Sequence, residues 1–159
     1  MKYLIVDTRE KPKAIRNILE YFDAQGVPYE SSKLLFGDYM DWNRPGIVID
    51  RKQNIAELAK NVTIEKNRFM RELEKAKAAG AKLVILVEQN RFKDRENWIH
   101  VEKISDLMLW SNPHTKLRGE QIFRALSALE NRYDIEVVFC DKRQTGRQIF
   151  EIIYGKNPS

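Results

Sequence analysis

The stretch Lys82-Leu-Val-Ile-Leu-Val-Glu88 decides the fold class, because five consecutive apolar residues stand between two charged ends. Such a run is typical of a strand that is covered on both faces of a sheet. Apolar spacing predicts further strands at 3–6, within 28–39, at 46–50 and at 135–140, and helices near 15–22 and at 53–60, 65–79, 102–110, 119–131 and 143–155. Because strands and helices alternate along the chain, the predicted class is α/β.

Composition narrows the class of protein. The 159 residues include 28 basic and 23 acidic ones, a net charge of +5, and 43% are hydrophobic, which excludes a disordered polyelectrolyte. Scattered glycines and prolines predict a single domain over 1–159 with its core at about 2–155. No apolar run approaches the roughly 20 residues that span a bilayer, and Asp7 comes too early for a signal peptide. We therefore expect an intracellular protein without a membrane partner, cytoplasmic if the source is a prokaryote or a virus.

Two acidic residues are candidates for metal chemistry. Asp50 ends one predicted strand, and Asp38 lies in the extended segment before it. A hairpin between the two segments would bring the carboxylates together, where they repel each other unless a cation lies between them. Mg²⁺ suits such a pair, because it uses one or two carboxylates and keeps several waters. Lys52 points the same way as Asp50 and can orient a water or offset charge on a phosphate, although a charged strand end is often simply solvated.

Four short motifs, in order along the chain, carry a resemblance: Val6-Asp-Thr-Arg-Glu10, Gly26-Val-Pro-Tyr-Glu30, Leu35-Phe-Gly-Asp-Tyr-Met40 and Ile47-Val-Ile-Asp-Arg-Lys52. Together they resemble the nuclease domain of the XPF-type structure-specific DNA endonucleases, of the restriction-endonuclease-like superfamily. The resemblance continues through Arg68-Phe69, the strand 83–88 and the segment 121–139, and so covers nearly the whole chain. It implies a restriction-endonuclease-like fold, with a central mixed β-sheet flanked by helices.

The resemblance also implies a metal-dependent DNA endonuclease that hydrolyses phosphodiester bonds with Mg²⁺ or Mn²⁺. Its expected substrates are branched, flapped or junction DNA, in DNA repair or recombination. The motifs assign metal binding to Glu10, Asp38 and Asp50, completion of that shell to Asp7, alignment of the attacking water to Lys52, and a phosphate contact or a bracing role to Arg51.

Two positions depart from the family pattern. Asp50 stands where the family mostly has Glu, which keeps the charge on a shorter side chain. Ala56 stands where the family usually has Asp and offers no oxygen, while the neighbouring Glu57 is rotated by about 100° on a helix. Ala56 favours a second hypothesis, a catalytically degenerate DNA-binding or scaffold subunit of the same fold. A sequence-specific restriction-type nuclease is a third.

Structural roles stay open for two motif residues. Asp7 can pair with a neighbouring base, Arg9 or Lys11, instead of serving a metal. Arg51 can form a salt bridge within the protein instead of contacting substrate.

Basic residues outside the acidic motifs are candidate DNA contacts: Arg9, Arg68, Arg71, Arg91, Lys93, Arg95, Lys116 and Arg118. Arg68 and Arg71 share a helix face, but Glu72 makes a solvated, ion-paired face an equal alternative. The segments 89–100 and 111–118 are expected to be loops, in which bases contact the DNA backbone and Trp98 stacks on an unpaired base. Ordinary polar loops explain these two segments equally well.

The C-terminal helix has two interpretations. Its apolar residues over 148–154 belong to the core by default, whereas the resembled family dimerises through its C-terminal helices, which implies a homodimer. That family's helix-hairpin-helix domain is not found in the sequence. His100 and His114 lack the His and Cys neighbours of a zinc site, and Cys140, the single cysteine, is expected in the core.

Overall fold

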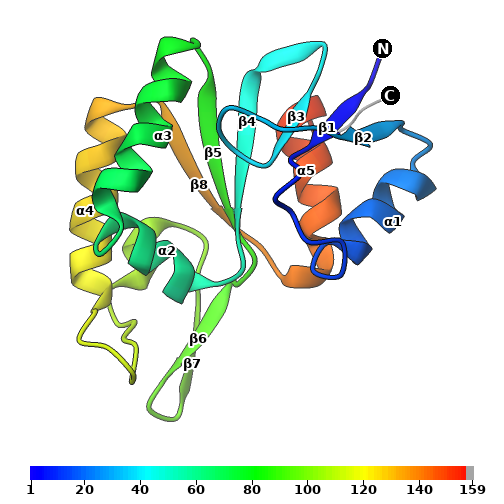
Figure 1. Ribbon diagram of the computed structural model, residues 1–159. Coiled ribbons are helices and arrows are strands. Elements are labelled where there is room, and N and C mark those ends of the chain that lie inside the picture. Colours follow the sequence, from blue (N-terminus) through cyan, green and yellow to red (C-terminus); the bar gives the residue numbers. More distant parts are fainter. Residues whose placement is uncertain (157–159) are drawn as a thin grey trace.

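A six-stranded mixed sheet lies between two layers of helices in the computed structural model, which describes residues 1–156 (Figure 1). The strand order is β2-β1-β3-β4-β5-β8. The strands are β1 (Leu4–Val6), β2 (Tyr29–Ser31), β3 (Tyr39–Asp41), β4 (Arg44–Lys52), β5 (Lys82–Val87) and β8 (Ile135–Phe139). Strands β4, β5 and β8 run parallel, whereas β3 is antiparallel to both of its neighbours. The predicted α/β class with a central mixed sheet is confirmed.

The helices divide between the two faces of the sheet (Figure 1). On one face lie α1 (Arg16–Ala24) and α5 (Thr145–Tyr154); on the other lie α2 (Ile55–Val62), α3 (Lys66–Ala78) and α4 (Gly119–Arg132). Each face has its own hydrophobic core. The central strand β5 contributes to both, which explains its unbroken apolar sequence.

Strand alternation in β4 sorts the motif residues between the two faces. Val48 packs in the core beneath α2, α3 and α4, and Ile49 packs in the core beneath α1 and α5. Successive strand side chains point to opposite faces, so Asp50 and Lys52 share the face of Val48, and Arg51 shares that of Ile49.

The segment 28–39 forms two strands where a single extended stretch was predicted. Strands β2 and β3 pair with opposite edges of β1. The chain turns between them because the Ser32 N–H donates to the Val6 carbonyl at 2.9 Å, and the Leu34 N–H donates to the Asp7 carboxylate at 2.8 Å.

Two further predictions are wrong after β5. The expected loop 89–100 contains an antiparallel hairpin, β6 (Arg91–Asp94) and β7 (Asn97–His100), whose inner residues Phe92 and Ile99 pack on the core. The expected helix 102–110 is reduced to one short 3₁₀ turn, η1 (Ile104–Leu107). A second 3₁₀ turn, η2 (Lys142–Gln144), leads from β8 into α5.

The remaining described parts follow the sequence pattern. Cys140 is buried, as predicted. The last three residues of the predicted domain, 157–159, lie outside the described ones. Within residues 1–156, no helix is both long enough and apolar enough to cross a membrane.

Candidate active site

The hairpin formed by β3 and β4 places Asp38 opposite Asp50. Tyr39 pairs with Ile49 in the register, and the Asp38 N–H donates to the Ile49 carbonyl at 2.7 Å. Gly37 makes this approach feasible, because its φ is +74° and an added Cβ would lie 2.3 Å from the Val48 Cγ1 atom. Both carboxylates therefore lie on the face of the sheet toward α2 and α3.

The environment of Asp38 destabilises its negative charge. Burial, followed by the negative charges of Asp50 and Glu10, raises the pKa of Asp38 to about 9. One contact acts in the other direction, since the Arg51 backbone N–H donates to Asp38 Oδ2 at 2.8 Å. The Lys52 ammonium lies 3.1 Å from Asp50 Oδ2. A cation bound between the carboxylates would remove the repulsion that favours a neutral Asp38.

A pocket of about 390 Å³ opens over this pair. Its sheet side consists of Gly37, Asp38, Asp50 and Lys52, with Arg9 at the rim. The opposite wall comes from α2, α3 and the turn between them: Glu57, Lys60, Asn61, Glu65, Arg68, Phe69 and Glu72. The pocket thus has two carboxylates at its floor, and its walls carry both basic side chains, Lys60 and Arg68, and acidic ones, Glu57, Glu65 and Glu72.

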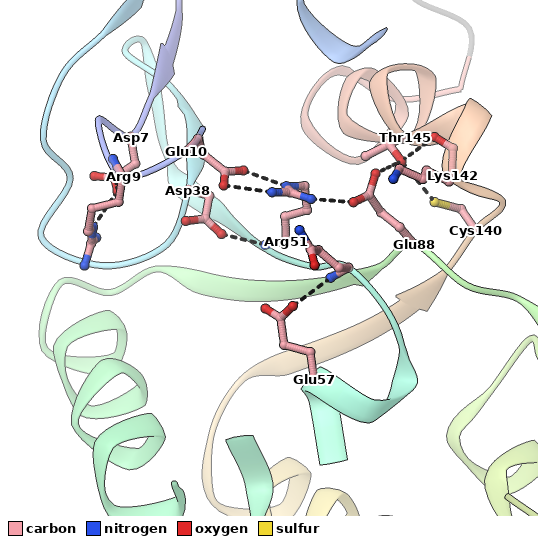
Figure 2. Close-up of polar contacts among 11 residues, drawn as sticks. Asp7, Arg9, Glu10, Asp38, Arg51, Glu57, Glu88, Cys140, Lys142 and Thr145 are labelled. Carbon is pink, nitrogen blue, oxygen red and sulfur yellow. Dashed lines mark hydrogen bonds and ion pairs between the residues drawn. The ribbon is translucent and has the colours of Figure 1, made fainter. Parts of the chain in front are cut away.

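Arg51 points away from the pocket and joins two buried carboxylates (Figure 2). Its guanidinium donates to both oxygens of Glu10 at 2.7 and 3.0 Å, and to Glu88 Oε1 at 2.5 Å. Glu88 Oε2 accepts from the Thr145 hydroxyl at 2.6 Å, at the start of α5. Burial by itself lowers the pKa of Arg51, but the hydrogen bonds and charges of the two glutamates outweigh it and raise that pKa, so the guanidinium stays charged. We call Arg51, Glu10, Glu88 and Thr145 the buried clamp.

The donor set suits a hard divalent ion at two carboxylates. Within residues 1–156, no group of three or more His, Cys, Asp or Glu side chains is arranged to hold a metal. Glu10, a predicted ligand, has both oxygens turned toward Arg51. Asp38 and Asp50 remain, and a half-buried pair of repelling carboxylates fits an ion such as Mg²⁺, which completes its shell with water.

Comparison with known proteins assigns the chain to a family. The sequence profile of the ERCC4 domain matches residues 6–151. The chain belongs to the ERCC4 domain family. Membership confirms the resemblance that the four motifs indicated.

Solved structures confirm the fold of this ERCC4 domain. XPF from Aeropyrum pernix matches with a TM-score of 0.65 and 20% sequence identity, over 95% of this chain and 63% of that one. XPF from Aeropyrum pernix in complex with DNA matches with a TM-score of 0.65 and 21% identity, over 96% and 64%. The ERCC4 domain thus spans less than two thirds of the length of these chains. A search among curated protein sequences found no match.

Asp7 of the ERCC4 domain holds the loop before Asp38. One of its oxygens lies 2.5 Å from Arg9 Nε, and the other accepts from the Leu34 N–H (Figure 2). Burial alone raises the pKa of Asp7, but the hydrogen bonds from Arg9 and Leu34 and the charge of Arg9 outweigh it and lower that pKa. The structure therefore contains an ion pair between Asp7 and Arg9, one of the two partners that the sequence allowed for Asp7.

The position of Ala56 carries no oxygen toward the pocket, and Glu57 lines the pocket in its place. Ala56 is half-buried against the core. The Glu57 carboxylate accepts from the Gln53 N–H at 3.2 Å, and the Glu57 N–H donates to the Asn54 side chain, which caps α2. Helix capping thus fixes a third carboxylate in the wall of the pocket.

The predicted DNA contacts fall into three places. Arg9 and Arg68 line the pocket, with Arg71 exposed one turn along α3 from Arg68. Arg91, Lys93 and Arg95 belong to the β6–β7 hairpin, and Lys116 and Arg118 to the segment before α4. Arg68 lies 3.7 Å from Glu65, so its ionic contact is weak and its guanidinium remains 76% exposed.

Sequence reasoning missed two members of the buried clamp. Glu88 appeared only as the end of the strand 83–88, and Thr145 carried no signal. They are 37 and 94 residues from Arg51 along the chain, so only the parallel pairing of β4 with β5 and the position of α5 bring them together.

Proposed function

We propose that the chain is a metal-dependent DNA endonuclease that hydrolyses phosphodiester bonds with Mg²⁺ or Mn²⁺. The observation that carries this proposal is the opposed pair of Asp38 and Asp50 at the floor of the pocket, with the Lys52 ammonium beside it. Both carboxylates are half-buried, and two like charges held close together have little structural use without a cation.

Asp38 and Asp50 would hold the ion. When bound, it would supply a polarised phosphate oxygen and a water of lowered pKa. Lys52 orients the attacking water or offsets charge on the phosphate, and its ammonium lies over the Phe69 ring, 5.6 Å from the ring centroid. Arg9 and Arg68 bind the flanking phosphates at the rim.

The buried clamp acts one layer behind this chemistry. Arg51 belongs to the same strand as Asp50 and Lys52, and its backbone N–H donates to Asp38. Its guanidinium, fixed by Glu10 and Glu88, therefore keeps that end of β4 in place. We assign Arg51 and Glu10 as positioning residues, with Asp7 fixing the loop that leads to Asp38.

The proposed substrates are DNA molecules with a branch, flap or junction, inside cells. Family membership supports this class, and one structural neighbour is a complex of XPF with DNA. A homodimer through the C-terminal helix is also proposed from the family. Because Ile149, Phe150 and Ile153 of α5 are buried within the chain, such a dimer would use the remaining face of the helix, which includes the half-buried Ile152.

The direct test uses purified protein with labelled flap, fork and four-way junction DNA in Mg²⁺ or Mn²⁺. We expect nicking by the wild type, and loss of nicking by at least about 100-fold in Asp38→Ala and in Lys52→Ala, with folding checked by circular dichroism. Binding without any cleavage under either metal would overturn the proposal and favour the degenerate subunit that Ala56 suggests. Cleavage at one sequence of a linear duplex would favour a restriction-type nuclease.

Glu57 offers a way to measure how far the departure at Ala56 matters. If Glu57 replaces the missing carboxylate, Glu57→Gln reduces nicking, and Ala56→Asp in that background restores part of it. Equal nicking by the wild type and Glu57→Gln would limit Glu57 to helix capping.

A further inference from the structure

A second concave site lies beside the catalytic pocket, at the carboxyl ends of β5 and β8. It is a groove of about 430 Å³ between the β6–β7 hairpin and the η2 turn. Its walls include Arg91 and Trp98 on the hairpin, and Lys142 and Arg143 on the turn. The clamp residue Glu88 also lines it, so the contact of Glu88 with Arg51 connects the groove to strand β4 of the catalytic pocket.

The hairpin presents two different faces. Phe92 and Ile99 pack on the core. Arg91, Lys93, Trp98 and His100 alternate with them along the two strands and are exposed. The hairpin also projects from the body of the molecule at its lower end (Figure 1). A two-stranded ribbon built in this way leaves a polar, aromatic face for a ligand.

Trp98 is the centre of the exposed face. Its side chain is 56% exposed, which is unusual for so large an apolar group. The Arg91 guanidinium lies 4.4 Å from the ring centroid, and the Lys93 ammonium lies 5.2 Å from it. These cation–π contacts hold the ring in place without covering it.

The charges around the groove favour an anion with a flat, unpaired base. The basic side chains that line the groove are Arg91, Lys142 and Arg143. Two acids lie among them: Asp141 is neutralised by Arg143 at 3.0 Å, and Glu88 is neutralised by Arg51. Basic side chains beside an exposed aromatic ring are typical of sites that bind single-stranded DNA. The phosphates contact the cationic groups, and a nucleobase stacks on the ring.

We infer that this groove binds an unpaired DNA strand that leaves the catalytic pocket, with a base stacked on Trp98 and phosphates at Arg91 and Lys142. The inference rests on the proposed function for its choice of DNA. It adds the element that would distinguish a flap or fork from continuous duplex.

The test measures binding and cleavage separately. Binding of a labelled oligothymidylate of about 12 nucleotides is followed by fluorescence anisotropy in EDTA, where no metal supports cleavage. We expect Trp98→Ala to weaken this binding by about tenfold, and Trp98→Phe to restore most of it, because the phenyl ring still stacks. Trp42→Ala is the matched control: Trp42 is 66% exposed, but it belongs to the turn between β3 and β4. It should bind as the wild type does.

Charge reversal tests the other wall. Lys142→Glu should weaken single-strand binding several-fold and leave binding of a blunt duplex unchanged. Equal binding by Trp98→Ala, Trp42→Ala and the wild type would overturn the inference. An equal loss for single strand and duplex would also overturn it and would assign the hairpin to duplex contact.

The two proposals fail in different ways. If the wild type cuts flap DNA and Trp98→Ala binds single strands normally, the proposal of the strand-binding groove is wrong and the proposal of a nuclease stands. If the wild type binds single strands through Trp98 but never cuts DNA, the proposal of the groove stands and the proposal of a nuclease is wrong.

Discussion

At the residue scale, Arg51 differs from the two other residues of the segment 50–52 in the face of the sheet to which its side chain points. Its neighbours in the sequence, Asp50 and Lys52, face the pocket, whereas Arg51 faces two glutamates on the other side of the sheet. Its side chain is 6% exposed, so solvent screens these contacts little. The same strand therefore carries the residues proposed to react on one face and the Arg51 contacts that hold the strand in place on the other.

Removal of this guanidinium should be costly. We expect Arg51→Ala to lower the free energy of unfolding by about 3–5 kcal/mol, because Glu10 and Glu88 would remain buried without a cation. The measurement is urea unfolding followed by circular dichroism. Arg124→Ala is the control, since Arg124 pairs with Glu120 on an exposed helix face and should change stability by less than about 1 kcal/mol. Equal effects of the two variants would contradict the clamp.

Asp7 predicts a pH dependence of stability. Because its pKa is lowered in the folded protein, the folded state holds the proton less tightly than the unfolded state does. Its contribution is present above the ordinary pKa of 3.8 and is lost as the pH falls through the lowered value. We expect the unfolding midpoint in urea to fall as the pH decreases from about 5 to about 2, and to fall less in Asp7→Asn. The same decline in both proteins would show that Asp7 contributes nothing.

At the scale of elements, the β3–β4 hairpin depends on one glycine. Gly37→Ala should destabilise the protein by more than Gly26→Ala and should abolish nicking. Both glycines have positive φ, so each substitution carries about 1–2 kcal/mol of backbone strain. Only at Gly37 does the new Cβ also collide with Val48, whereas nothing lies within 4 Å at Gly26. Thermal unfolding of the two variants side by side is the measurement, and similar melting temperatures would contradict the close approach.

Sequence patterns predicted the long elements and failed at the short ones. The helices α3 and α4 and the strand β5 carry apolar residues at a clear period, so their positions are confirmed within a few residues. The β6–β7 hairpin has only Phe92 and Ile99 facing the core, and its turn has Arg95 at a φ of 58°, where glycine or asparagine is usual. No turn signal therefore marked it as a hairpin.

The candidate active site, like the fold, could be predicted from the sequence only in part. Alternation along a strand placed Asp50 and Lys52 on one face, and the hairpin to Asp38 followed from the two extended segments. The partners of Arg51 were not predictable, because they depend on which strands lie side by side in the sheet.

At the scale of the whole molecule, the acidic pair should link stability to divalent metal. We expect Mn²⁺ to raise the melting temperature of the wild type by several degrees, since a ligand that binds only the folded state stabilises it. Asp38→Ala should not respond to the metal, and without metal it should melt at or above the wild-type temperature, because the repulsion with Asp50 is gone. The measurement is a thermal melt with EDTA or Mn²⁺, and equal metal-induced shifts in both proteins would exclude Asp38 as a ligand.

The residues that line the pocket and those that line the groove come from different stretches of the chain, and this affects how the protein can evolve. Every residue that lines the catalytic pocket lies between positions 9 and 72, whereas the hairpin groove is lined by residues from 88 onward. The proposed cutting site and the proposed strand-binding groove are thus lined by separate parts of the sequence, which the pairing of β4 with β5 and the contact of Arg51 with Glu88 hold together. The stretch between β5 and α4 carries the hairpin wall of the groove and no residue that lines the pocket. Under the proposed function, its exchange with that of a relative would alter the choice of DNA shape without replacing a pocket residue.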